Sequence, residues 1–243
     1  MSKTPKVSIV MPTWNRVDLT EKAICSLIDT IENDYINAEI IVVDNGSEDE
    51  TPLYLSDLKK SGLIQKLVLN KENEGCGKAT NKGMALAEGE WIMEVDNDIQ
   101  MLRGWYDIAM EKFRDIPDLG QLGFLSIQWP YKLYANINIG PPNVAGAWIM
   151  PRRFYDEGVR WCEKTWKEEP WQAKLFSKQI QDKGFVTGNL LEPKAIDLAE
   201  GNHLKHLEYY QKTFKDRQIE PILKDLIKQE KYAKQKNDKR GKE

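Results

Sequence analysis

Strand-like and helix-like segments alternate along the first half of the chain, and this alternation limits the possible folds more than any other feature. Short apolar runs that suit strands occupy residues 6–11, 38–44, 65–70 and 90–96. Apolar residues recur at helical spacing between these runs. The run at residues 38–44 is continuous rather than alternating, which is typical of parallel strands covered on both faces. The pattern predicts an α/β fold in which right-handed crossovers join parallel strands.

Single residues indicate where several elements begin and end. The helix before the fourth strand is expected to end at Gly89, a suitable C′ residue. A strand is expected in residues 146–154. Residues 168–185 suit a helix that has Pro170 at its first position and Gly184 after its end. Lysine dominates the C-terminal end, and we expect its last dozen residues to be disordered.

Composition excludes several classes of protein. The 243 residues are 41% hydrophobic, enough for one core with a smaller lobe. A net charge of −3 gives no general attraction to nucleic acid or membrane. The chain has neither an apolar run long enough to cross a bilayer nor the hydrophobic region of a signal peptide. Its three cysteines are widely spaced, so we expect a cytoplasmic protein without disulfides.

Polar segments follow all four predicted strands. Ligands bind open α/β sheets at the carboxyl ends of the strands. These ends are residues 12–16, 44–49, 70–78 and 96–98. Because they meet at one edge of a parallel sheet, we expect Asp96 and Asp98 to face a cleft.

Two aspartates separated by one residue can share a hard divalent cation. Mg²⁺ and Mn²⁺ prefer oxygen ligands and often take one or two carboxylates plus phosphate oxygens. Arg16 and Lys78 are among the few cations at this edge, so a bound diphosphate would need a metal ion to neutralise it. The alternative is that Asn97 and Asp98 cap the following turn.

Other polar residues at the edge have two interpretations each. Asp44 can accept hydrogen bonds from a nucleotide, although the following Asn45-Gly46 is also a common turn pair. The glycine-rich stretch at residues 75–78 does not match a dinucleotide loop, because Thr80 replaces the third glycine. It does not match a P-loop either, since Ala79 follows Lys78.

The segments "VSIVMPTWNR", "IIVVDNGSEDET", "NEGCGKATNKGMALAEGEWIMEVDND" and "VAGAWIMPRRFYDEGV", in this order, resemble family 2 inverting glycosyltransferases of the GT-A fold. The resemblance covers roughly residues 6–190. It implies a mostly parallel sheet flanked by helices, with a smaller acceptor-side lobe and a charged helical C-terminal tail. Residues 1–125 would bind the nucleotide sugar, 126–212 the acceptor and the catalytic base, and 213–243 would form the tail.

The resemblance also implies roles for individual residues. A nucleoside diphosphate sugar, most often a UDP-sugar, would contact Pro12, Thr13, Asn15, Arg16, Asp44, Asn73, Gly75, Lys78 and Asp96. Mn²⁺ or Mg²⁺ would bind Asp98 and Asp96, with Asp197 or His203 as a third ligand. An acceptor hydroxyl would then displace the diphosphate with inversion.

The general base is where the chain departs from the family pattern. The family places an acidic pair about a dozen residues before a helix-ending glycine, and here that position holds Gln172 and Ala173. The nearest acidic pair is Glu168-Glu169. We favour Glu169 as base, because Pro170 at the first helical position would make it the N-cap, where the helix dipole keeps it ionised. A plain capping role is the alternative.

Aromatic residues of the second half suggest an acceptor platform, because ring faces stack on sugars and bases. The candidates are Trp129, Tyr131 and Trp148, and packing of the smaller lobe is the alternative. The acceptor would be a carbohydrate, a lipid-linked sugar or a protein, with a modified nucleic acid base as a further candidate. The lysine-rich tail also fits a protein peripheral to an anionic membrane.

Three other functions compete with this interpretation. A sugar nucleotidyltransferase would need a glycine-rich loop after the first strand, and residues 12–16 contain no glycine. A glycoside hydrolase needs two carboxylates on opposite sides of a glycosidic bond, which Asp96 and Asp98 are too close to provide. An inert sugar- or nucleotide-binding module of the same fold remains open because of Gln172 and Ala173.

Overall fold

The structure is a computed structural model. It describes residues 6–125, 132–134, 137–139, 144–164, 168–169 and 171–199. Residues 1–197 form one compact unit, and residues 198–243 form a second, of which only residues 198 and 199 are described. Trp129, Tyr131 and His203 therefore lie outside the described residues.

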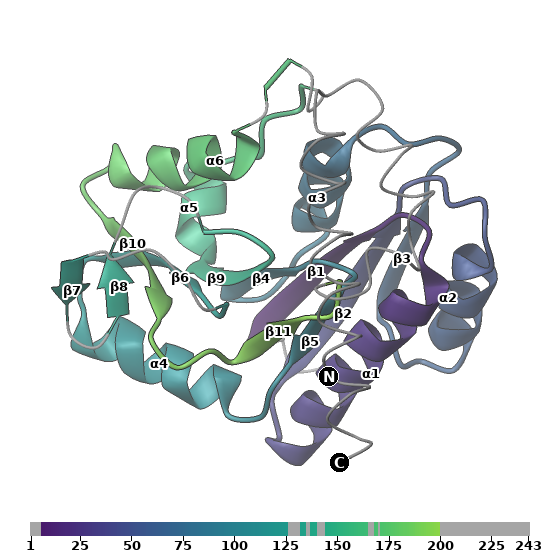
Figure 1. The fold of residues 1–243 in the computed structure, drawn as a ribbon, viewed down its shortest axis with the longest axis horizontal. Coiled ribbons are helices and arrows are strands. Elements are labelled where there is room, and N and C mark those ends of the chain that lie inside the picture. The colour runs from purple at the N-terminus through teal and green to yellow at the C-terminus, as the bar shows by residue number, and fades with distance from the viewer. Residues whose placement is uncertain are drawn as a thin grey trace, which may run out of the picture. The chain divides into compact units, whose positions relative to one another are not determined.

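The described residues of the first unit contain one large mixed sheet. Its strands are β1 (Val7–Thr13), β2 (Ala38–Asp44), β3 (Lys66–Leu69), β4 (Trp91–Val95), β6 (Leu119–Gly123), β7 (Lys132–Tyr134), β8 (Ile137–Ile139), β9 (Ala147–Pro151) and β10 (Val186–Leu190). Their order across the sheet is β3-β2-β1-β4-β9-β6-β10-β8-β7 (Figure 1). The first four strands are mutually parallel, which confirms the α/β fold predicted from the sequence. β9 enters antiparallel between β4 and β6.

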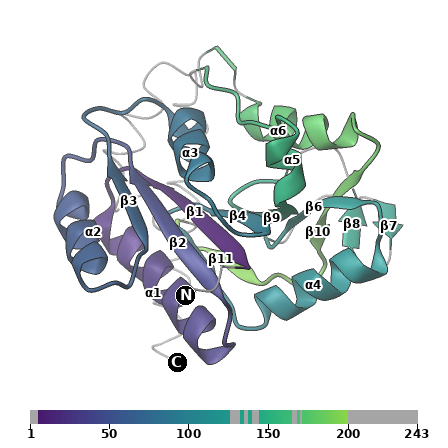
Figure 2. The ribbon, with the colours of Figure 1, turned by 180° about the vertical axis from the view of Figure 1, so that it is seen from behind.

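Helices cover both faces of this sheet. α1 (Val17–Asn33), α2 (Thr51–Lys60) and α4 (Trp105–Asp115) lie on one face, and α3 (Cys76–Ala85), α5 (Arg152–Asp156) and α6 (Gln172–Gln181) on the other (Figures 1 and 2). Successive side chains of a strand point to opposite faces. Met93 and Val95 of β4 accordingly pack with α1 and α4, whereas Ile92 packs with the residues around α3 and α6.

A second, two-stranded sheet lies beside the end of β4. It pairs β5 (Ile99–Met101) with β11 (Ala195–Asp197) in antiparallel register. The sequence patterns did not indicate either strand, because each has three residues, too few to show a period. Among the described helices, none has both the length and the apolar character needed to cross a bilayer.

Two predicted helix boundaries are wrong. α3 ends at Ala85, with Leu86 as C-cap, so Gly89 is not its C′ residue. Gly89 instead permits close approach to β1, since a Cβ there would lie 2.7 Å from the backbone nitrogen of Ser8. α6 begins at Gln172 with Trp171 as N-cap, so position 170 is not the first helical position.

A glycine determines how closely α3 packs on the sheet. A Cβ at Gly83 would lie 2.4 Å from Cγ1 of Val10 and 3.3 Å from Cγ2 of Val43. Since overpacking a core costs about 1–3 kcal/mol, Gly83→Ala should lower the free energy of unfolding despite its better helix propensity. Urea denaturation measures this, with Ala85→Ser at an exposed position of the same helix as control. Equal stability of Gly83→Ala and the wild type would contradict this packing.

Candidate active site

The ends of β1 and β2 lie side by side and their loops interlock. Thr13 and Asp44 are paired in the parallel register, so both strands end at the same level. In the loops, the backbone N–H of Asn15 donates to Oγ of Ser47 at 2.7 Å, and Oδ1 of Asn15 accepts from the N–H of Glu48 at 2.8 Å. The sequence predicts that the nucleoside diphosphate sugar binds at this edge of the sheet.

An arginine links the loop after β1 to the end of β4. Asn15 and Arg16 have φ values of +54° and +60°, a left-handed conformation that is uncommon outside glycine. This backbone aims Arg16 at the acidic segment: Nη1 donates to Oδ2 of Asp98 and Nη2 to Oδ1 of Asn97, both at 2.8 Å. Asn97 donates in turn to Oγ1 of Thr20 at 2.8 Å. We call Arg16, Asn97 and Asp98 the Arg16 clamp.

The clamp alters two interpretations made from the sequence. Arg16 is only 8% exposed and is bonded to Asp98, so its charge is already engaged. Asn97 bonds to Arg16 and α1 rather than to the turn that follows it. Strained backbone often persists at functional sites, where the surrounding structure holds it.

Asp96 and Asp197 lie on neighbouring elements. Asp96 directly follows β4, and its N–H donates to the carbonyl of Gly146 at 2.7 Å. Asp197 is opposite Ile99 in the β5–β11 pair. The candidate third metal ligand is thereby brought beside the Asp96–Asp98 segment from a point a hundred residues later in the chain.

Negative charge accumulates around Asp96. Burial raises the pKa of its carboxyl well above the usual range, and the charges of Glu94, Asp98 and Asp197 raise it further. Arg16 acts in the opposite direction, but it does not outweigh these effects. A carboxylate in such surroundings is stabilised by a cation.

Asp44 forms part of a tightly bonded turn. It is 1% exposed; its Oδ1 accepts from the hydroxyls of Thr13 and Ser47, and its Oδ2 accepts from the N–H of Ser47 at 3.0 Å. These contacts correspond to the turn interpretation of the sequence. Contact between Asp44 and a nucleotide stays a prediction.

Side-chain amides join the loops after β2 and β3. Asn45 donates to Oδ1 of Asn73 at 2.9 Å and accepts from Nδ2 of Asn70 at 3.0 Å. Gly46, with φ +76°, lies against the backbone of Glu72, because a Cβ there would come within 2.6 Å of the carbonyl carbon. The sequence indicates only a turn at Asn45, because its contacts depend on a loop that follows a different strand.

The remaining donor-side residues differ in accessibility. Gly75 is the N-cap of α3, and its N–H donates to Oδ1 of Asn73 at 2.9 Å. Lys78 is exposed on the first turn of α3, whereas Pro12 is buried within β1. An exposed lysine at a helix N-terminus suits a flexible contact with phosphate.

The expected capping role of Glu169 is wrong. Because α6 begins at Gln172, Glu169 precedes the helix, although its Oε1 accepts from the N–H of Trp171 at 3.2 Å. Glu168 is exposed, and Glu169 is partly buried. Gln172, at the position where the family has an acidic residue, is 1% exposed and donates to the carbonyl of Lys164 at 2.6 Å.

Trp148 is not an acceptor platform. Its side chain is 0% exposed, and its ring centroid lies 4.8 Å from that of Phe176 in the core between the sheet and α6. It therefore packs the lobe, which was the alternative reading of the aromatic residues. Trp171 is 64% exposed beside the start of α6 and is the better candidate for contact with an acceptor.

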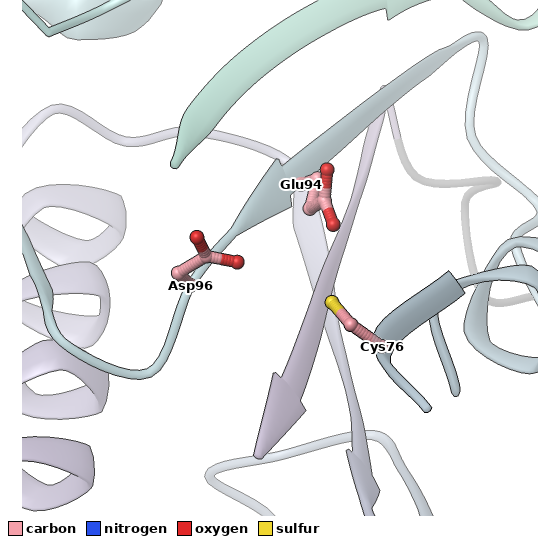
Figure 3. A group of neighbouring side chains, drawn as sticks. All are labelled: Cys76, Glu94 and Asp96. Carbon is pink, nitrogen blue, oxygen red and sulfur yellow. The ribbon is translucent and has the colours of Figure 1, made fainter. Parts of the chain in front are cut away.

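Sequence reasoning missed a buried carboxyl next to the acidic segment. Glu94 is 2% exposed, and its Oε1 accepts from Oγ1 of Thr80 at 3.0 Å. Burial raises the pKa of Glu94 to about 7, although hydrogen bonding from Thr80, Trp148 and Trp161 lowers it in part. The signal was a glutamate inside an apolar strand, "WIMEV". The thiol of Cys76 and the carboxyls of Glu94 and Asp96 lie together beside the end of β4 (Figure 3).

The sequence profile of Glycosyl transferase family 2 matches residues 8–185. The chain belongs to this family. The predicted family is thus confirmed.

Relatives of known name share part of their length with the chain. The GalNAc(5)-diNAcBac-PP-undecaprenol beta-1,3-glucosyltransferase of Campylobacter jejuni is 37% identical over 110 residues, which cover 44% of this chain and 34% of the relative. The poly(ribitol-phosphate) beta-glucosyltransferase of Bacillus spizizenii is 34% identical over 124 residues, covering 48% and 19%. The chain thus matches about a third or less of the length of these relatives.

Solved structures share the fold at low sequence identity. The mannosyltransferase PcManGT of Pyrobaculum calidifontis, in complex with GDP-Man and Mn²⁺, has a TM-score of 0.60 at 21% identity, covering 91% of this chain and 69% of that one. S. aureus TarS 1–349 in complex with UDP-GlcNAc has a TM-score of 0.59 at 16% identity, covering 78% and 57%. These similarities confirm the GT-A-type fold.

The Arg16 clamp should contribute measurably to stability. Arg16→Met leaves Asp98 without its charged partner in a largely buried site, so we expect a loss of about 2–3 kcal/mol in the free energy of unfolding. Arg114→Met is the control, because Arg114 pairs with Asp115 at the surface and should change stability by less than about 0.5 kcal/mol. Chemical denaturation distinguishes the two. Similar losses in both variants would mean that the clamp is not formed.

Glu94 should make stability depend on pH. Because its pKa of about 7 in the folded protein lies above the ordinary value of 4.5, its stabilising contribution is full below pH 4.5 and is lost as the pH rises through 7. From pH 4.5 to pH 8, the free energy of unfolding of Glu94→Gln should therefore rise by on the order of 2–3 kcal/mol relative to that of the wild type. Chemical denaturation in the presence of a chelator measures this difference. Glu90→Gln, just before β4, is the control. A constant difference across this range would contradict the buried carboxyl.

Proposed function

We propose that the chain transfers a sugar from a nucleoside diphosphate sugar to an acceptor hydroxyl, with inversion and with the help of a divalent cation. The observation that carries this proposal is that Asp96, Asp98 and Asp197 lie close to one another at the end of β4, where Asp98 bonds to Arg16 of the loop after β1. Family membership supports the reaction class, and UDP-GlcNAc and GDP-Man in the complexes of its structural neighbours support the donor class. We favour a UDP-sugar.

The acidic residues fit a hard cation. Asp98, Asp96 and Asp197 offer carboxylate oxygens, the ligands that Mn²⁺ and Mg²⁺ prefer. Arg16 bonds to Oδ2 of Asp98, so we assign Oδ1 as the ligand atom. The ion would supply positive charge to the departing diphosphate. His203 is the alternative third ligand.

The chain's own residues hold the donor in this proposal. Thr13, Asn15 and Asp44 would border the nucleotide, with Pro12 fixing the end of β1. Asn73 and Gly75, joined by a hydrogen bond, would border the ribose and diphosphate, and Lys78 would contact phosphate. Arg16 would act mainly by fixing the direction of Asp98.

We assign the general base to Glu169, with Glu168 as the alternative. Glu169 is held by the N–H of Trp171 and is partly buried, which suits a base that must stay in one place, whereas Glu168 is exposed. Such a base takes the proton from the acceptor hydroxyl during attack.

The name of one relative indicates the class of acceptor. The C. jejuni relative is named for a lipid-linked sugar, which supports a lipid-linked acceptor and a protein peripheral to the membrane. A cytoplasmic location stays a prediction. A carbohydrate, a protein or a modified nucleic acid base remain candidates. One observation favours a second function, an inert binding module: Gln172 and Ala173 occupy the family's acidic positions.

Donor binding is the direct test of the proposed function. UDP or GDP with Mn²⁺ should raise the melting temperature, since a ligand at about 100 times its Kd stabilises the folded state by about 2.7 kcal/mol. Omission of Mn²⁺ should reduce the shift, because the diphosphate then meets the acidic segment without a cation. Stabilisation by NAD or ATP, and by none of the nucleoside diphosphates or their sugars, would contradict the donor class.

Substitution of Asp98 separates an enzyme from a binder. Asp98→Asn should lower sugar transfer or donor hydrolysis by about 10²–10³-fold, because a charge-stabilising group in the transition state is lost. His203→Ala should lose far less activity, and Asp115→Asn, at an exposed position of α4, should lose none. Product formation is followed by mass spectrometry. Equal losses for Asp98→Asn and His203→Ala would contradict the ligand assignment, and no product from the wild type with any donor would favour the binding module.

A further inference from the structure

A thiol and two carboxyls meet on the α3 side of β4. Sγ of Cys76, at the first position of α3, and one carboxylate oxygen each of Glu94 and Asp96 all lie within 4.8 Å of one another. Glu94 and Asp96 are two residues apart, so both project from the same face, toward the sulfur of Cys76 (Figure 3). We call these three residues the thiol–carboxylate cluster.

Glu94 is incompletely satisfied in its buried position. Thr80 donates to Oε1 at 3.0 Å, whereas Oε2 has no hydrogen bond of standard geometry among the described residues, and the indoles of Trp148 and Trp161 that act on this carboxyl are neutral. A buried polar oxygen that lacks a partner costs about 1–3 kcal/mol, and more when it is charged. A strand core would accept an apolar residue at this position without that cost. Neutral donors leave the charge of an ionised Glu94 uncompensated, so this carboxylate can still take a cation.

The charge around the cluster is negative on several sides. The carboxylates of Asp96, Glu94 and Asp98 add to burial in raising the pKa of the Cys76 thiol. Arg16 is the positive neighbour of Asp96, and its guanidinium is bonded to Asp98 and Asn97. A cation at the cluster would satisfy Glu94 and offset this field.

We propose that Cys76, Glu94 and Asp96 bind a thiophilic divalent cation of the zinc type, at a position distinct from the oxygen of Asp98 assigned above to Mn²⁺ or Mg²⁺. Zinc accepts sulfur and carboxylate ligands together, at roughly 2.3 Å and 2.0–2.2 Å. In a tetrahedral site two such ligands lie roughly 3.5 Å apart. Because the three ligand atoms lie within 4.8 Å of one another, binding would need the side chains to close on the ion by up to about 1 Å. Magnesium disfavours sulfur and would not select this set.

The site would regulate the proposed reaction, and this consequence rests on the proposed function. Asp96 belongs to the cluster and also borders the proposed donor site. Zinc held by Cys76 and Glu94 would therefore withdraw Asp96 from the donor and lower transfer in the presence of Mn²⁺. With three protein ligands, the ion keeps an open position for water or for a phosphate oxygen.

Cobalt titration tests the site without any measurement of activity. Co²⁺ replaces zinc in such sites, and a bond between cobalt and thiolate gives a charge-transfer absorption in the near ultraviolet. When Co²⁺ is added to the full chain, reduced and stripped of metal beforehand, this absorption should appear and reach its maximum at one Co²⁺ per protein. Cys76→Ser should abolish it, whereas Cys25→Ser and Cys162→Ser, the matched controls, should keep it. Glu94→Gln should weaken cobalt binding by about 10-fold or more, and Zn²⁺ should displace the cobalt.

The outcomes distinguish this site from the donor site. Asp98→Asn should keep the cobalt absorption while it loses transfer, so either proposal can fail without the other. Absence of the absorption in the wild type, or its persistence in Cys76→Ser, would overturn the thiol–carboxylate site. Loss of the absorption in Asp98→Asn would also overturn it, because the cation would then be bound through Asp98.

Discussion

The contact of one guanidinium with the tip of β4 is the interaction on which the arrangement of the site depends. Arg16 donates to Asp98 and Asn97 from a left-handed backbone that begins α1, and Asn97 is bonded in turn to Thr20 of the same helix. A planar fork can hold two acceptors in one geometry, which a lysine cannot do. The acidic segment is thus fixed in direction before any ligand arrives, and preorganisation of this kind lowers the cost of binding.

The same strand presents different chemistry at its end and on its α3 face. Asp98 faces Arg16 and the loops of β1, where carboxylate oxygens suit a hard cation. Glu94 and Asp96 face Cys76, where sulfur changes the preference toward a softer ion. Asp96 lies between the two groups, and the charges of Glu94, Asp98 and Asp197 all act on it. Under the two proposals, the metal bound at Asp96 would decide whether the donor site is complete.

Residues at strand ends were predictable, and those that depend on distant partners were not. Thr13, Asp44 and Asp96 follow apolar runs, and parallel strands must bring such ends to one edge. The direction of Arg16 depends on two residues with positive φ, which no local pattern marks. Trp148 was expected at an acceptor surface because composition does not reveal burial. The start of α6 was predicted too early, because Pro170 suits a first helical position and the sequence does not reveal the burial of Gln172. The sequence therefore located the edge of the sheet but not the contacts within it.

The central claim is that the acidic end of β4 holds a divalent cation beside a nucleoside diphosphate. Crystals soaked with Mn²⁺ and UDP, with data collected for anomalous scattering from manganese, test this most directly. The account predicts an anomalous peak bonded to Asp98, with Asp96 or Asp197 nearby and the diphosphate bridging to it from the loops of β1 and β2. A nucleotide bound elsewhere, with no peak beside Asp98, would contradict it.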